Sequence, residues 1–337
     1  MQPIRVGLMG LGRVGRGVFR LTADRDDIHL VAIAEKIDPA ALAYLLRFDS
    51  LRGRFGQPVT ASDGAVEVAG RKIAVVSTRD PEAVDWQALG VDVVIEEGAP
   101  RNRATLEGPL ARGARRVVLC SPPSEAPDLT VLRGINDDQL TASHRIVSAG
   151  SFSAAAAAPI LATLEAKFGL ERVFLSSVHA YTDDQRLADV PAPDMRSGRA
   201  AAENIVPQPS YAGPVLESVM PGLAGKLDGQ AMNVPVANGS AVDLVCWHRD
   251  EVSVETIQAA VREAADSARF AGILAYEPEP IVSSDVIGSS HSATFDAQAT
   301  MALGGKVSKT LTWFDNGWGH AHRVLELIER FRRLEVA

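Results

Sequence analysis

Short apolar runs alternate with longer helical patterns along the first 150 residues of the chain. Such alternation predicts a parallel β-sheet with helices on its faces, which is an α/β fold. The apolar runs that we interpret as strands are Ile4–Met9, His29–Glu35, Val91–Glu97, Arg116–Cys120 and Arg145–Val147.

From about residue 170 the pattern changes to longer β-rich stretches, Arg172–Tyr181, Gln230–Trp247 and Ala299–Phe314. One clear helix, Ser253–Ala271, lies between the last two of these stretches. This order predicts a second domain of the α+β class with a mainly antiparallel sheet.

The final segment predicts a closing helix with one buried face. Its apolar residues recur at spacings of three and four and form a single stripe. The residues of this stripe are Val324, Leu327, Ile328, Phe331 and Leu334.

One uncharged stretch, Ile146–Leu164, reaches the length of a membrane span. It is rich in Ala and Ser and is interrupted by Gly150 and Pro159, so we interpret it as buried protein. Near the N-terminus the first apolar run leads directly into glycines, without the ordered regions of a signal peptide. We therefore expect neither a membrane span nor a secretory leader.

Length and composition agree with two globular domains. The chain has 337 residues, more than one compact core usually holds, and 46% of them are hydrophobic and 23% charged. This composition excludes a disordered chain, collagen-like repeats and a disulfide scaffold. Forty-two acidic against 34 basic side chains give a net charge of −8, so a nucleic acid is not an expected partner.

The two cysteines, Cys120 and Cys246, are too few for a disulfide framework or a four-thiolate zinc site. They suit a reducing cytosol. We expect a cytoplasmic protein without a metal site.

A glycine-rich turn, Gly10-Leu11-Gly12-Arg13-Val14-Gly15, follows the first predicted strand and opens a helical pattern, and Glu35 ends the second strand. Such glycines let the backbone approach a pyrophosphate on the helix N-terminus, while the distal carboxylate binds ribose hydroxyls. This combination predicts a dinucleotide site. The alternative is a simple tight turn with a solvated Glu35.

A series of motifs spans nearly the entire chain in register: Gly10-Leu-Gly-Arg-Val-Gly-Arg16, Phe48-Asp-Ser-Leu-Arg-Gly-Arg-Phe55, Arg79-Asp-Pro81, Val178-His-Ala-Tyr-Thr182, Gly272-Ile-Leu-Ala-Tyr276, Val282-Ser-Ser-Asp285, Thr294-Phe-Asp296 and Trp313-Phe-Asp-Asn316. Together these motifs closely resemble the type I glyceraldehyde-3-phosphate dehydrogenase family. On that basis the chain is identified as a divergent member.

The resemblance implies a Rossmann NAD-binding domain, residues 1–151, completed by a C-terminal helix, residues 317–337. It places a catalytic domain, residues 152–316, between them and implies a homotetramer that acts in carbohydrate metabolism. In that family a cysteine attacks an aldehyde, a histidine acts as base, hydride goes to NAD and phosphate releases the acyl group. The implied ligands are NAD and a small-molecule substrate.

The position of the nucleophile departs from the family. Ser148-Ala-Gly-Ser151 and Ala158-Pro159 align without a gap to the family's Ser-Asn-Ala-Ser-Cys-Thr-Thr-Asn-Cys-Leu-Ala-Pro segment, which puts Phe152 at the nucleophilic cysteine. Phenylalanine has no lone pair and no titratable proton, so it forms no acyl thioester. Its ring also takes up space where the reacting carbon would lie. The alternative is a shifted alignment, with Phe152 as a core aromatic.

His179 matches the family's base, and a histidine can accept a proton from a hydroxyl or a hydrated carbonyl. The alternative is an inherited histidine that now only fills space. A relocated nucleophile at Cys120 is a further alternative, against the role of a small buried residue.

Several residues match positions that hold or surround the substrate and the attacking phosphate: Ser151, Thr182, Asp184, Arg199 and Ser210. Arg199 is the remaining strong phosphate donor among them. Capping and turn roles are the alternative for the hydroxyl-bearing residues. Asn233 stands where the family has arginine, and Tyr211 places a phenol where the family has glycine, which weakens the case for a bisphosphorylated intermediate.

On the cofactor side, the resemblance implies that Asn316 fixes the nicotinamide amide and that Arg79 and Cys120 belong to the cofactor set. Met9, Ala34 and Glu97-Gly98-Ala99 replace family residues in the cofactor-binding set, which predicts reduced affinity. Glu35 would repel a ribose 2′-phosphate, and Val190-Pro191 resembles the apolar pair that excludes it. We therefore expect NAD rather than NADP.

The leading hypothesis is an NAD-dependent oxidoreductase that avoids the acyl-thioester route, with His179 as acid and base and Arg199 holding a small anionic substrate. A non-catalytic NAD-binding subunit, alone or mixed with an active paralogue, is the alternative, because fold does not fix function. Ordinary phosphorylating activity is a third hypothesis.

Overall fold

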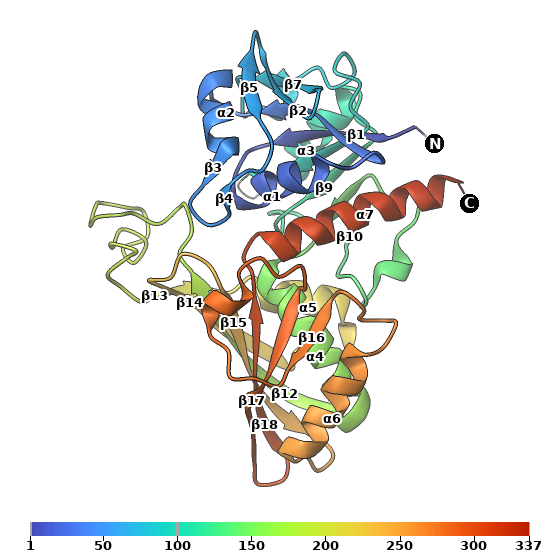
Figure 1. Ribbon diagram of the computed structural model, residues 1–337. Coiled ribbons are helices and arrows are strands. Elements are labelled where there is room, and N and C mark those ends of the chain that lie inside the picture. Colours follow the sequence, from blue (N-terminus) through green and yellow to red (C-terminus); the bar gives the residue numbers. More distant parts are fainter. Residues whose placement is uncertain (1, 99–100, 337) are drawn as a thin grey trace. The chain divides into compact units, whose positions relative to one another are not determined.

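The computed structural model of the chain describes residues 2–98 and 101–336. The chain divides into two compact units, which are described separately below (Figure 1). The first comprises Met1–Val131, Asp138–Gly150 and His320–Ala337, and the second comprises Leu132–Asp137 and Ser151–Gly319. The short segment Leu132–Asp137 therefore belongs to the second unit, which the sequence did not predict.

The first unit is built on a nine-stranded sheet with the order β10-β11-β9-β8-β1-β2-β7-β6-β5. The pairings from β10 to β7 are parallel, whereas β5 and β6 extend the sheet as an antiparallel hairpin. The strands are β1 (Ile4–Met9), β2 (Ile28–Ala34), β5 (Val59–Ser62), β6 (Ala65–Val68), β7 (Arg71–Val76), β8 (Val93–Glu96), β9 (Arg116–Leu119), β10 (Leu129–Thr130) and β11 (Ile146–Ser148).

The α/β prediction for this unit is confirmed. The predicted strands correspond to β1, β2, β8, β9 and β11, with ends that differ by at most two residues. The hairpin strands escaped prediction because each has only four residues and β5 carries mostly small or polar side chains, so that their pairing with β7 stabilises them more than their own apolar pattern. A separate two-stranded ribbon joins β3 (Phe48–Asp49) and β4 (Gly53–Arg54), and the helices are α1 (Arg13–Thr22), α2 (Pro39–Arg47) and α3 (Arg103–Ala111), with two 3₁₀ turns at Pro81–Ala83 and Asp137–Gln139.

The chain ends with helix α7 (Trp318–Val336), drawn red in Figure 1. Its predicted apolar stripe is buried, since Val324 and Ile328 are fully inaccessible to solvent. Arg116 lies over the Phe331 ring at 4.4 Å, and Glu329 pairs with Arg25 at 2.6 Å. These contacts make the C-terminal helix part of the first unit.

The second unit holds a seven-stranded sheet with the order β13-β14-β12-β15-β18-β17-β16. The sheet is mixed: its central pairings β12–β15, β15–β18 and β17–β18 are antiparallel, and β12–β14 and β16–β17 are parallel. The strands are β12 (Leu170–Ala180), β13 (Val206–Pro209), β14 (Leu227–Val234), β15 (Ser240–His248), β16 (Leu274–Glu277), β17 (Ala293–Leu303) and β18 (Val307–Phe314).

The helices of this unit are α4 (Phe152–Phe168), α5 (Ala212–Val219) and α6 (Val254–Ala265), with 3₁₀ turns at Pro221–Leu223 and Ser283–Val286. Helix α6 begins after Ser253, whose hydroxyl accepts a hydrogen bond from the Thr256 amide in a capping box. It ends six residues before the predicted end, because Asp266 and the turn that follows leave the helix.

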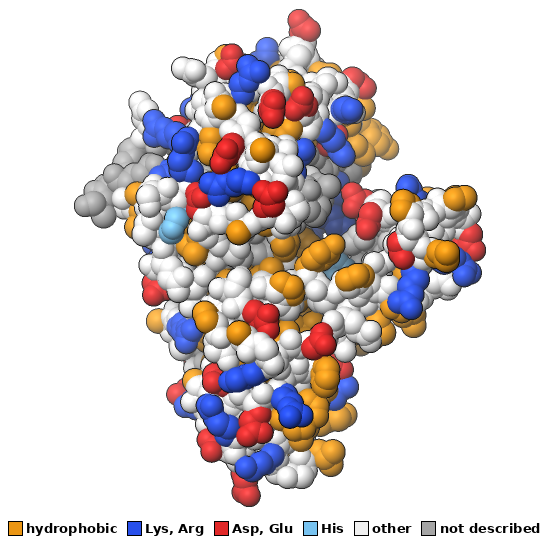
Figure 2. All heavy atoms as spheres, turned by 180° about the vertical axis from the view of Figure 1, so that it is seen from behind, with side chains coloured by type: hydrophobic (Ala, Val, Ile, Leu, Met, Phe, Trp, Pro, Cys, Tyr) orange, Lys and Arg blue, Asp and Glu red, His pale blue; other side chains and the backbone are white. Residues whose placement is uncertain are grey.

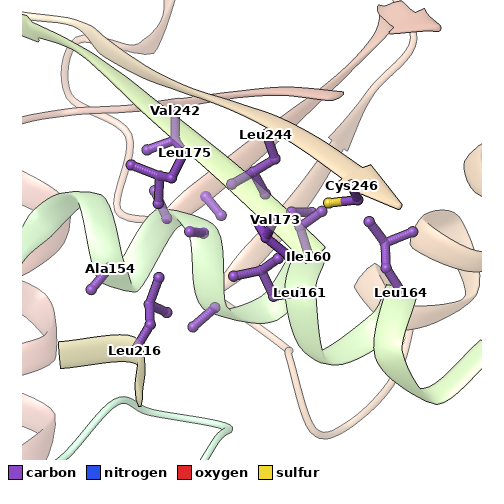
Figure 3. Packing of buried hydrophobic residues seen from close by; sticks show 14 of the residues in the cluster. Ala154, Ile160, Leu161, Leu164, Val173, Leu175, Leu216, Val242, Leu244 and Cys246 are labelled. Carbon is purple, nitrogen blue, oxygen red and sulfur yellow. The ribbon is translucent and has the colours of Figure 1, made fainter. Parts of the chain in front are cut away.

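Helix α4 lies in the centre of the second unit's core. Figure 3 shows its side chains facing β12, β15 and α5. Its alanines, residues 154–158, are mostly inaccessible, and such small side chains allow close packing around the whole helix. The labelled contacts in Figure 3 come from Ala154, Ile160, Leu161 and Leu164 of α4, Val173 and Leu175 of β12, Leu216 of α5, and Val242, Leu244 and Cys246 of β15.

The interpretation of the uncharged stretch 146–164 as buried protein is confirmed, since it forms β11 and most of α4. Within the described part of the chain, every helix is too short or too polar to cross a membrane. On the face that Figure 2 shows, basic and acidic side chains are interspersed, and the described Lys and Arg residues form no continuous stripe there.

Candidate functional site

The glycine-rich turn leads from β1 into α1. Gly10 has a positive φ of 94°, which glycine adopts without steric penalty, and its amide donates to the Ala34 carbonyl at 3.0 Å. Gly12 is the N-cap residue, and no side chain of the helix caps the first turn. The amides that begin α1 therefore need an acceptor from elsewhere.

Glu97, directly after β8, supplies that acceptor. Its Oε2 accepts hydrogen bonds from the amides of Gly12 at 2.7 Å and Gly15 at 2.8 Å, and its Oε1 accepts from Val14 at 2.7 Å. A Cβ at Gly12 would lie 2.6 Å from Oε1, and one at Gly15 would collide with Oε2. The turn is thus an anion-binding site, and the anion that it holds is a side chain of the same protein.

The pairing of strands explains how Glu97 reaches the turn. Strands β8 and β1 are parallel neighbours with Glu96 paired to Met9, so both strands end at the same edge of the sheet. Sequence reasoning noted Glu97 only as a replacement that reduces cofactor affinity and missed its contact with the turn. An acid directly after the strand beside β1 was the available signal. Ala99, the last residue of that replaced trio, lies outside the described residues.

Burial raises the pKa of Glu97 to about 7, while the amides of Gly15, Gly12 and Val14 and the positive charge of Arg16 act in the opposite direction. Burial also raises the pKa of Glu96, which Arg101 contacts at 3.1 Å. The end of β8 therefore carries two acids in an environment that disfavours their charge.

Glu35 is buried rather than solvated, with 7% of its surface exposed, so the alternative of a solvated strand-end acid is wrong. Its carboxylate accepts hydrogen bonds from Nε of Arg79 at 2.5 Å and Nη2 at 2.7 Å. The Lys36 amide donates to it at 2.8 Å. Glu35 and Arg79, both predicted to bind the cofactor, thus form an ion pair with each other. Arg13, a third residue of that predicted set, is the first residue of helix α1.

Cys120 follows β9 and is 3% exposed. Burial raises the pKa of its thiol well above the ordinary value, and the charges of Glu97 and Glu96 add to the effect. A nucleophilic cysteine needs the opposite environment, because the thiolate is the reactive form. The structure contradicts the alternative of a relocated nucleophile, and Cys246, whose pKa burial raises to about 12, is equally unsuited.

In the second unit, Phe152 is the first residue of α4 and lies beside His179, with ring centroids 6.3 Å apart. Phe314, at the end of β18, has its ring centroid 6.2 Å from that of the imidazole. Two aromatic rings therefore lie close to the histidine. Phe152 also packs against the core cluster, so it combines the position expected of the nucleophile with a partly buried ring.

Hydrogen bonds fix the tautomer of His179. Its Nδ1 lies 2.7 Å from the Ala180 carbonyl and must donate there, so Nε2 carries the lone pair of a neutral ring. Asn316 Nδ2 donates to this Nε2 at 3.1 Å, and Asn316 Oδ1 accepts from the Ser240 hydroxyl at 2.8 Å. The amide is oriented toward the histidine by Ser240, which sequence reasoning did not identify.

The predicted anion-binding positions of this unit are engaged with neighbouring groups. The Thr182 hydroxyl donates to Asp184, and the Thr182 amide donates to Gln185 Oε1 at 3.2 Å. Asn233, 7% exposed, donates to the same oxygen at 2.6 Å. Asn233 is thus part of an internal hydrogen-bond network.

Arg199 and the two serines are occupied as well. Arg199 is exposed and pairs with Asp189 at 3.0 Å. Ser151 caps α4 by accepting from the Ala154 amide at 3.2 Å, and Ser210 accepts from the Ala212 amide at 3.2 Å. Tyr211, which follows Ser210, is 65% exposed.

The predicted residues thus form two groups. The glycine turn, Glu35, Arg79 and Cys120 lie at the carboxyl edge of the first sheet, and Phe152, His179 and Asn316 meet in the second unit. Among the described residues, no three His, Cys, Asp or Glu side chains are grouped as metal ligands.

Comparison with known proteins identifies the family. Residues 4–100 match the family model described as the glyceraldehyde 3-phosphate dehydrogenase NAD binding domain, and residues 151–316 match that of the C-terminal domain. The chain belongs to the glyceraldehyde-3-phosphate dehydrogenase family. It is 42% identical over 327 residues to the glyceraldehyde-3-phosphate dehydrogenase of Streptomyces coelicolor, covering 96% of this chain and 97% of that protein.

Two further relatives extend the comparison. The glyceraldehyde-3-phosphate dehydrogenase of Geobacillus stearothermophilus is 41% identical, with 96% of this chain and 97% of that protein covered. The protein of that name from Mycobacterium leprae is 40% identical, with the same coverage. These findings indicate NAD as the cofactor. The residues present fit it, because the turn amides are arranged to bind an anion and Glu35 directly follows β2.

Proposed function

We propose that this family member is an NAD-dependent oxidoreductase that exchanges hydride directly with a small anionic hydroxy or carbonyl compound, without a thioester. The observation that carries the proposal is the pair Phe152 and His179, 6.3 Å apart. The histidine keeps a lone pair on Nε2, but the adjacent side chain has no nucleophilic atom.

The chain's own residues supply acid–base chemistry. In the oxidation of an alcohol, His179 Nε2 takes the hydroxyl proton, after the Asn316 amide that now donates to it has turned to the substrate. Bound NAD supplies the hydride acceptor. Ser151, Thr182 and Arg199 offer donors for an anionic group, provided that Arg199 exchanges Asp189 for the substrate.

A panel of phosphorylated and carboxylated hydroxy compounds tests this proposal. Substrate-dependent NADH absorbance should appear with at least one compound, and His179→Ala should lower kcat by about 10²-fold or more with little change in fold. Turnover that survives His179→Ala at full rate contradicts the assignment of the base.

The second candidate is a non-catalytic NAD-binding subunit. Two observations favour it: the acid–base residue is hydrogen-bonded to Asn316 rather than free, and Glu97 lies on the turn amides. This candidate predicts NAD binding with no turnover on any compound of the panel. It also predicts mixed oligomers when the protein is co-expressed with an active paralogue.

We expect no phosphorylating oxidation of glyceraldehyde 3-phosphate, because Phe152 cannot form the thioester and Asn233 replaces the arginine. Cys120 cannot substitute for the nucleophile, since it is buried and its pKa is raised. Phosphate-dependent NADH production that persists in Cys120→Ser would refute this expectation.

The cofactor preference and the assembly are parts of the same proposal. NAD should bind more tightly than NADP in calorimetry because Glu35 carries a negative charge at the ribose position; equal affinity for both contradicts it. We also expect a cytosolic homotetramer, and the exposed apolar residues Leu187 and Met195, 90% and 89% accessible in the isolated chain, support the interface between subunits. Light scattering that gives a monomer at micromolar concentration argues against it.

A further inference from the structure

The Glu97 carboxylate occupies a site suited to a phosphate. Three backbone amides of the turn, those of Gly12, Val14 and Gly15, donate hydrogen bonds to its two oxygens. The nitrogen–oxygen distances are 2.7 to 2.8 Å. These distances are those of charge-assisted hydrogen bonds, and the partial positive charge of the helix N-terminus adds to them. A pyrophosphate at this turn would use the same donors.

The two anions cannot bind the turn together. An amide hydrogen directed at a carboxylate oxygen at 2.7 Å is not available to a phosphate oxygen. Two negative groups sharing one helix N-terminus would also repel each other. The glycines do not relieve this conflict, because the space that they leave is filled by the Glu97 carboxylate itself.

We propose that Glu97 is an internal competitor of NAD: its carboxylate holds the pyrophosphate site closed, and NAD binds only when this side chain leaves the turn. The inference concerns cofactor binding alone, so it rests on the NAD assignment and holds for either candidate function. It makes Glu97 a determinant of cofactor affinity, where the sequence predicted only a weakened contact.

The surroundings of Glu97 define how its displacement depends on pH. The charged and titratable groups that interact with it are Arg16 on α1 and the thiol of Cys120 after β9. Burial raises the pKa of Glu97 to about 7, and departure into solvent returns it toward its ordinary value of 4.5. NAD binding at pH 6 should therefore release close to one proton, and affinity should increase as pH rises from about 5 to 7.

Calorimetric titration with NAD tests the competition in the full-length protein. Glu97→Ser removes the competing acid and should lower the Kd for NAD at least about tenfold at pH 7. Glu97→Gln keeps the shape but not the charge and should give an intermediate Kd without proton release at pH 6. The matched control Glu67→Gln, at an exposed position of β6, should behave as the wild type.

The measured Kd values separate the competition by Glu97 from the assignment of NAD as cofactor. Equal Kd values for wild type, Glu97→Ser and Glu97→Gln, or weaker binding of NAD in both variants, overturn the proposal that Glu97 competes with NAD, while the NAD assignment stands. Absence of NAD binding in all of these proteins, with circular dichroism confirming that they are folded, refutes the cofactor assignment itself. Proton release that is the same in wild type and Glu97→Gln excludes Glu97 as the titrating group.

Discussion

Helices α1 and α4 satisfy the amides of their N-termini by different means. At α1 a glycine is the N-cap, no side chain of the helix caps the turn, and Glu97 arrives from the neighbouring strand. At α4 the cap is local, because Ser151 accepts from the Ala154 amide, and the next residue is Phe152. The first N-terminus binds a carboxylate from another strand, whereas the second is capped locally and begins with an aromatic residue.

The difference separates a cofactor half from a half that we propose to be catalytic. In the cofactor half, the amides of the turn bind the Glu97 carboxylate. In the catalytic half, the aromatic residue beside His179 is Phe152, which has no nucleophilic atom. Each half can be perturbed on its own, and the predictions below begin with the largest expected effect.

The stability of the first unit should depend on Glu97 and pH. The pKa of Glu97 is about 7 in the folded protein and 4.5 ordinarily, so the folded state binds this proton more tightly. The contribution of this proton to the free energy of unfolding is fully present below pH 4.5 and is lost as pH rises through about 7. It amounts to at most about 3 kcal/mol. Unfolding by denaturant at pH 5, 6, 7 and 8 measures this effect.

Glu97→Gln provides the comparison for that measurement, because it lacks the titrating proton. Burial lowers the pKa of His320 to about 4, so this residue destabilises the fold as pH falls, which is the opposite direction. That contribution is common to both proteins and cancels in their difference. Stability curves that run parallel between pH 5 and 8 contradict the raised pKa of Glu97.

Phe152→Cys should create a reactive thiol if the α4 N-terminus keeps its catalytic environment. The helix dipole and His179 would both stabilise a thiolate. A thiol pKa near 6.5 instead of about 8.5 makes alkylation at pH 7 about twentyfold faster. The measurement uses a Cys120→Ser background, and His179→Ala should abolish most of the acceleration.

Phe174→Cys, on an exposed position of β12, is the matched control for an ordinary thiol. If the thiol at position 152 reacts at the rate of this control and ignores His179→Ala, the catalytic half has lost more than its nucleophile. The non-catalytic subunit then becomes the better description.

The local cap of α4 should contribute a moderate stability. Ser151→Ala removes the acceptor for the Ala154 amide and should lower the free energy of unfolding by about 1 kcal/mol. Ser151→Asn retains a capping oxygen and should keep most of the stability that Ser151→Ala loses. Thermal unfolding measures both, and identical destabilisation by the two variants would show that Ser151 acts other than as a cap.

Among these interactions, the ion pair of Arg79 with Glu35 should contribute least to the free energy of unfolding. Arg79 has 62% of its side chain exposed, and such pairs are worth up to about 1 kcal/mol. Arg79→Ala should therefore change denaturant stability by less than this amount, with Arg79→Lys closer to the wild type. A loss above about 2 kcal/mol would mean that Glu35 becomes an unpaired buried charge.

Much of the fold could be predicted because its strands are strongly apolar and its C-terminal helix has a regular stripe. The hairpin β5–β6 could not, since each of its strands has only four residues. The parallel pairing of β12 with β14 could not either, since it joins strands that are distant in sequence. The candidate residues were recognised by motif, and the structure brings Phe152, His179 and Asn316 together.

The sequence by itself determined the order of elements, the glycine turn and the phenylalanine at position 152, because periodicity and motif spacing are local properties of a chain. Only the tertiary structure decided that Glu97 lies on the amides of Gly12 and Gly15, that Arg79 pairs with Glu35, and that Cys120 is buried. These outcomes depend on which strands lie side by side at one edge of the sheet, where charge and solvent access are set by neighbours far away in the sequence.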